Sequence, residues 1–114
     1  MVSVDKLLIK NEDYLQAVEV DEVYFFTMEK GRVIAVLKNS RIELTASLYL
    51  VNELLSRTQS FLRCHKSYVV NVRKIEKISR YNNKTYNIKF RDIKEQAYIT
   101  EANLRILKER FLAL

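Results

Sequence analysis

The sequence predicts a mainly β domain with a short helix in the middle of the chain and a second helix at its C-terminal end. Most apolar residues lie in short runs, often alternating with polar residues, and turn-forming residues separate the runs. Only two segments carry apolar residues at spacings of three and four, as one face of a helix requires. With 114 residues and 48% apolar composition, we expect residues 1–114 to form one domain with its own core.

Five strands are expected in the first part of the chain, at residues 6–10, 14–20, 23–26, 32–38 and 41–45. Polar turn residues separate them. Two dipeptides, Lys30-Gly31 and Asn39-Ser40, are suited to hairpin turns, and Gly31 is the only glycine of the chain.

The middle of the chain predicts a helix. Ser47 is a suitable N-cap, and the helix is expected to extend to about Arg57. Its expected apolar face consists of Leu48, Val51, Leu54 and Leu55.

The second half predicts further strands at residues 61–64, 85–90 and 93–100. Residues 72–81 fit a strand or a helix equally well, and residues 82–84 are expected to form a hairpin loop. Thr100 is a suitable cap for a last helix over residues 101–112, whose expected apolar side consists of Leu104, Leu107 and Phe111.

The positive charge is concentrated in a quarter of the chain. The net charge is +6, but residues 57–84 alone carry +7, and residues 1–29 carry −5. Such a distribution is typical of a surface that faces a polyanion, with DNA or RNA as the main candidates. A solvated basic surface without a partner remains the alternative.

Several classes of protein are excluded or disfavoured. No apolar run approaches the ~20 residues of a membrane span, and the first residues lack the apolar segment of a secretory signal. One cysteine cannot form an internal disulfide or a multi-thiolate metal site, so we expect no metal and a reducing compartment. With dispersed carboxylates and a single histidine, we expect neither an enzyme nor a cofactor.

One segment, residues 61–78, carries a recognisable motif. It resembles the signature of the LytTR family, the DNA-binding output domains of many bacterial response regulators. The matching positions are Phe61, Arg63, His65, Lys66, Ser67, Tyr68, Val69, Val70, Asn71, Ile75 and Ile78. The resemblance covers nearly all of residues 4–112. It implies an elongated arrangement of antiparallel sheets, whose loops enter successive grooves of double-stranded DNA.

The resemblance also implies partners. Family members bind paired direct repeats, with a second copy of the domain on the same face of the duplex. A phosphorylatable receiver domain often precedes the module, and we find no phospho-acceptor pocket in these residues. We therefore expect a cytoplasmic regulator of transcription that does not bind membranes. An RNA- or protein-interaction module using a basic face remains the alternative.

The resemblance implies three loops as the contact regions. Lys66 and Ser67 follow a strand end, where side chains and amides point outward to phosphates or base edges. Arg63 suits a bidentate phosphate contact, although an intramolecular pair with an acid such as Glu76 fits equally well. The alternative for Lys66 is a loop lysine that contacts only solvent.

The second region lies around Gly31, which allows close approach of the backbone but has no side chain to read a base. Lys30 and Arg32 flank it, and Arg32 is the better candidate for reading guanine. The third region precedes the last helix. There the family often has an arginine where this chain has Ala102 or a neighbour, so we shift the expected contacts to Asn103 and Arg105.

Other conspicuous side chains are expected to be structural. His65 should hold the following loop by a hydrogen bond, and Asn71 should satisfy local backbone groups. Cys64 is expected to be a small buried group, with a redox-sensing thiol as the minor alternative. Tyr24, Tyr68, Tyr86 and Tyr98 are expected to pack in the core rather than to stack on bases.

Overall fold

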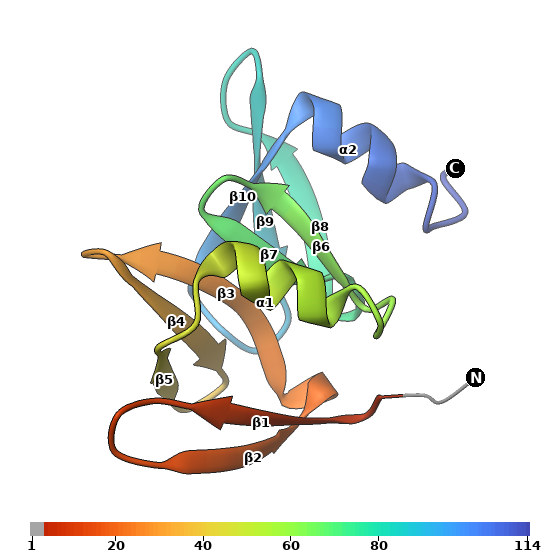
Figure 1. The fold of residues 1–114 in the computed structure, drawn as a ribbon. Coiled ribbons are helices and arrows are strands. Elements are labelled where there is room, and N and C mark those ends of the chain that lie inside the picture. Colours follow the sequence, from red (N-terminus) through yellow and green to blue (C-terminus); the bar gives the residue numbers. More distant parts are fainter. Residues whose placement is uncertain (1–3) are drawn as a thin grey trace.

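The computed structural model describes residues 4–114, which form three antiparallel sheets and two α-helices (Figure 1). The domain measures 42 × 37 × 26 Å. The strands are β1 (Lys6–Lys10), β2 (Leu15–Glu19), β3 (Val23–Glu29), β4 (Arg32–Leu37), β5 (Arg41–Leu44), β6 (Phe61–His65), β7 (Tyr68–Asn71), β8 (Ile75–Arg80), β9 (Thr85–Phe90) and β10 (Gln96–Thr100). The α-helices are α1 (Leu48–Leu55) and α2 (Glu101–Lys108), and short 3₁₀ turns occupy Val20–Glu22 and Val72–Lys74. The predicted fold class is confirmed.

A five-stranded sheet, in the order β5-β4-β3-β7-β6, is the centre of the molecule. Its two faces cover separate cores. Phe26 and Val69 face a core that α1 and the β1–β2 hairpin close, whereas Phe25 and Val70 face a core closed by the β10-β9-β8 sheet and α2. Because β3 and β7 are buried on both faces, their sequences are nearly continuous apolar runs instead of alternating ones.

The helix α1 begins where the sequence predicts and ends two residues early. The Ser47 Oγ accepts a hydrogen bond from the Leu50 amide at 3.1 Å, which confirms the cap. Leu48, Val51 and Leu55 are buried, but Leu54 is 55% exposed, so its placement on the apolar face was wrong.

The helix α2 is also shorter than predicted, ending at Lys108 instead of 112. Thr100 caps it through the Asn103 amide at 3.2 Å, as expected. Leu107 is buried, whereas Phe111 lies beyond the helix and is 49% exposed, which corrects its predicted apolar contact. Within residues 4–114, neither helix has the length and apolar character needed to cross a membrane.

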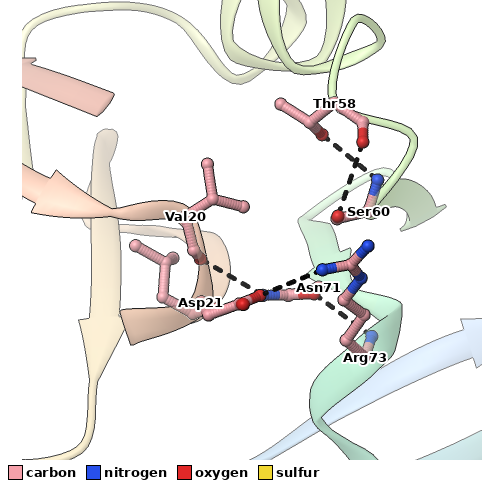
Figure 2. A network of polar contacts seen from close by, with 7 residues as sticks. Val20, Asp21, Thr58, Ser60, Asn71 and Arg73 are labelled. Atoms are coloured by element: carbon pink, nitrogen blue, oxygen red, sulfur yellow. Dashed lines mark hydrogen bonds and ion pairs between the residues drawn. The ribbon is translucent and has the colours of Figure 1, made fainter. Parts of the chain in front are cut away.

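The ambiguous segment 72–81 contains strand β8, and β7 is an additional strand that the pattern did not separate from its neighbours. Asn71 ends β7 and is fully buried. Its Nδ2 donates to the carbonyls of Val20 (3.3 Å) and Val23 (2.9 Å), and its Oδ1 accepts from the Arg73 amide (3.1 Å) (Figure 2). Only the last contact is local, as predicted. The other two tie β7 to the start of β3.

Candidate nucleic-acid interface

Hydrogen bonds bring three hairpin turns and the start of α2 into one row. The Met28 amide, at the end of β3, donates to the Ser67 carbonyl at 3.3 Å. The Asn103 Nδ2 donates to the Cys64 carbonyl at 3.0 Å, and the Glu101 amide donates to the Lys84 carbonyl at 2.9 Å. We call this row the turn edge. It comprises residues 30–31, 66–67, 82–84 and 101–103, and its hairpin turns follow the left and upper side of Figure 1.

The β3–β4 turn consists of Lys30 and Gly31, as predicted. Both residues have positive φ, 52° and 78°, which is the pattern of a type I′ hairpin turn. Lys30 is exposed. Arg32 is also exposed, but its guanidinium is hydrogen-bonded to Glu43 on the adjacent strand β5, and this contact raises the Arg32 pKa. The Arg32 Nη1 is therefore engaged within the domain, whereas no hydrogen bond in residues 4–114 involves its other guanidinium nitrogens.

The β6–β7 turn is a two-residue connection made of Lys66 and Ser67. The His65 Nδ1 accepts a hydrogen bond from the Ser67 amide at 3.1 Å, which confirms the predicted role of His65 in holding the loop. The Arg63 Nη2 donates to the Lys66 carbonyl at 2.8 Å. The alternative partner, Glu76, instead pairs with Lys89 at 3.4 Å. Lys66 is exposed at the tip of the turn.

The hydrogen bond to His65 predicts a pH dependence of stability. Burial, followed by the nearby charge of Lys66, lowers the pKa of His65 below its usual 6.5. Below pH 6.5 the unfolded chain therefore binds more protons than the folded one at this site, and stability falls as the pH falls through the folded-state pKa. Protonating Nδ1 also removes the acceptor of the Ser67 amide. We expect His65→Asn, measured by thermal melting between pH 7.5 and 5, to lose less stability on acidification than the parent. Parallel pH curves for the two proteins would contradict this assignment.

The first turn of α2 carries no positive charge. Glu101 and Ala102 are exposed, and Asn103 is half-buried because its side chain binds the Cys64 carbonyl. One amide hydrogen of Asn103 thus joins α2 to β6, a role that sequence reasoning missed. Arg105 is exposed on the next turn of the helix.

The aromatic side chains near the turns pack against one another. Tyr68 lies between His65 and Tyr98, with ring centroids at 5.8 and 5.9 Å, and Tyr81 packs on Tyr98 at 5.2 Å. Tyr24 is buried as predicted, while Tyr68, Tyr86 and Tyr98 are half-buried. This arrangement favours packing over base stacking for the predicted tyrosines.

Cys64 points into the core behind the turn, where it is fully buried, and this confirms the prediction of a small buried group. Burial raises the pKa of its thiol to about 12. The thiolate needed for nucleophilic or redox chemistry is therefore strongly disfavoured at neutral pH.

The basic stretch 57–84 is divided between two places. Arg63, Lys66, Arg80 and Lys84 lie on or next to the turn edge. Arg73 and Lys74 lie at the opposite end of the strands, where Arg73 pairs with Asp21 at 3.8 Å and the Lys74 ammonium lies 5.2 Å from the centre of the Tyr24 ring. The expectation of one continuous basic surface from this stretch was therefore too broad, since segments adjacent in sequence reach both ends of a sheet.

Comparisons with known proteins agree with one another. Residues 13–112 match the family model described as the LytTr DNA-binding domain. The chain is 31% identical over 94 residues to the sensory transduction protein LytT of Oceanobacillus iheyensis, and 32% identical over 105 residues to accessory gene regulator protein A of Staphylococcus aureus. These alignments cover 81% and 90% of this chain but only 37% and 41% of the relatives.

A solved structure shares the fold. It is the LytTr DNA-binding domain of a putative methyl-accepting/DNA response regulator from Bacillus cereus, with a TM-score of 0.75 and 20% sequence identity. The match covers 92% of this chain and 94% of that one. The arrangement of sheets described above is thus that of the matched domain.

Proposed function

The chain belongs to the LytTr DNA-binding domain family, and on that premise we propose that it binds double-stranded DNA sequence-selectively to regulate transcription. The turn edge is the observation that carries this proposal. It presents three exposed lysines on short, hydrogen-bonded turns, with Arg32 and Arg63 on the strands next to them, and turns of this kind can follow a duplex without a recognition helix. The proposed contacts are Lys30, Arg32, Arg63, Lys66, Ser67, Asn103 and Arg105.

The partners form part of the same proposal. The domain, with residues 1–114 acting as one unit, binds paired direct repeats together with a second copy of itself. We also propose a receiver domain in the same regulator and a cytoplasmic location, because the relatives are a sensory transduction protein and a gene regulator. The chain spans about two fifths of the length of these relatives. The role is non-enzymatic, since Cys64 is buried and protonated and the His65 Nδ1 is occupied by the Ser67 amide.

Selection from a randomised duplex pool at physiological salt tests the function. We expect an enriched pair of similar short sequences spaced about 10 base pairs apart, one helical turn. An unrelated duplex and a single-stranded RNA serve as competitors. Equal binding to every polyanion would contradict sequence-selective recognition, and preferential binding to the RNA would favour the RNA-interaction alternative.

We expect Lys66→Ala and Arg32→Ala each to weaken binding to the selected duplex by roughly tenfold, the usual order for a lost base contact. Lys38→Ala is the matched control, because it removes one exposed positive charge at the opposite end of β4. Fluorescence anisotropy with the selected and a random duplex measures the effect. If both variants bound both duplexes as tightly as the Lys38→Ala control, the assignment of contacts to the turn edge would be wrong.

A further inference from the structure

The β8–β9 turn lies on the turn edge, although the sequence analysis counted Lys84 only as part of the basic stretch 57–84 and not as a contact residue. The hydrogen bond between the Glu101 amide and the Lys84 carbonyl places Lys84 directly beside the first turn of α2. The pairing of Thr85 with Thr100 continues into this contact. Two segments seventeen residues apart in sequence thus form one surface.

Lys84 is exposed on a well-defined turn. Its amide donates to the Asn82 Oδ1 at 2.9 Å, and the amides of Tyr81 and Asn82 both donate to the Thr85 carbonyl, at 3.0 and 3.1 Å. With its carbonyl bound to Glu101 as well, the Lys84 backbone is held on both sides. The turn therefore presents the Lys84 ammonium to solvent without first having to become ordered.

The charge around this turn is positive. Residues 77–91 contain five basic residues and no acid. Arg80 lies over the Tyr86 ring at 5.1 Å, and Lys89 pairs with Glu76 at the far end of the hairpin. Among residues 4–114, no ion pair involves Lys84.

The neighbouring part of the turn edge lacks such a charge. The first turn of α2 contributes the acid Glu101, the small Ala102, and Asn103, whose amide is bound to the Cys64 carbonyl. A polyanion approaching the turn edge at α2 would meet a negative side chain first. Lys84, adjacent to Glu101, is the positive group placed to offset it.

We propose that Lys84 is a DNA phosphate contact, presented by the β8–β9 turn in place of a positive side chain on the first turn of α2. This inference rests on the proposed function, because it adds a contact to the same DNA-binding edge. A lysine acts here as a point charge on phosphate, so it contributes affinity about equally for all sequences.

The test measures the salt dependence of binding for the parent, Lys84→Gln and Lys89→Gln, using the selected and a random duplex. Each neutralised phosphate contributes about −0.9 to the slope of log K against log salt. We expect Lys84→Gln to bind both duplexes more weakly than the parent, by the same factor. The ratio of the parent's association constant to that of Lys84→Gln should fall about 3.5-fold between 50 and 200 mM salt. Lys89→Gln, which removes an equal charge from the same hairpin, should keep the parent's slope. Melting curves check that each variant is folded.

Adding Ala102→Arg to Lys84→Gln should restore the slope, because the new charge occupies the neighbouring position. An unchanged slope in Lys84→Gln, or no recovery in the double variant, would overturn the assignment. If the parent itself bound no duplex, the proposed function would fail with it. If the parent binds the selected duplex but Lys84→Gln has the same salt slope, the Lys84 contact is refuted and the proposed function is not.

Discussion

Replacing Phe25 by alanine should lower the free energy of unfolding by about 4 kcal/mol, the usual cost of emptying a buried aromatic site. Phe25 is 2% exposed and lies on the central strand β3. Its ring stacks on Phe90 of β9 at 5.2 Å and contacts Tyr68 of β7 at 5.8 Å. Removing it opens a cavity at the junction of two sheets.

Urea denaturation followed by circular dichroism measures this effect. Phe111→Ala is the control, because it removes the same ring from a site that is 49% exposed. We expect the control to cost less than about 1.5 kcal/mol, on the basis of its smaller loss of buried area. Equal losses in the two variants would show that the contact between Phe25 and Phe90 does not join the sheets.

Asn71→Ala is expected to cost about 3 kcal/mol, although asparagine is not an apolar residue. The substitution removes the Asn71 partner of the Val23 carbonyl and of the Arg73 amide, and a buried unsatisfied group costs about 1–3 kcal/mol. It also removes one of the two donors to the Val20 carbonyl, which still accepts a hydrogen bond from the Val23 amide. Water that enters the site would satisfy some of these groups, so the expected loss of stability lies near the lower end of the summed costs.

Asn71→Asp separates the two halves of this network. The aspartate retains an acceptor for the Arg73 amide but has no donor for the two carbonyls, and its charge is buried. It should therefore destabilise the protein at least as much as alanine does. Asn83→Ala, on an exposed turn, is the matched control and should melt as the parent does. If Asn71→Asp were as stable as the parent, the donor contacts to β3 would be unimportant.

Local chemistry made several elements predictable from the sequence. Ser47 and Thr100 cap their helices as expected, because a cap depends on residues only three positions away. The same is true of Gly31, which needs only its own positive φ to form the turn. The hydrogen bond from the Ser67 amide to His65 is equally local.

The predictions failed where contacts between segments distant in the sequence determine the structure. Strand β7 has four residues and is buried on both faces, so it shows no periodicity that separates it from its neighbours. The two long-range partners of Asn71 lie 48 and 51 residues away, and no pattern in the sequence indicates them.

The candidate site was also predicted only in part. The motif identified the β6–β7 turn, whereas the contact between Lys84 and Glu101 depends on sheet register. Arg32 was correctly placed beside its turn, but its pairing with Glu43 required knowledge of which strand lies next to β4. Predicting these contacts from sequence needs the strand pairing first.

The central position of β3 also has a consequence during synthesis of the chain. Its partner on one side, β4, follows immediately, but its partner on the other side, β7, leaves the ribosome about forty residues later. Until then, an apolar strand such as β3 keeps one unpaired edge that can join another nascent chain. Completion of β7 both closes that edge and delivers Asn71 to Val20 and Val23. The same short segment thus ends the period of aggregation risk and brings the β6–β7 turn to its place beside β3.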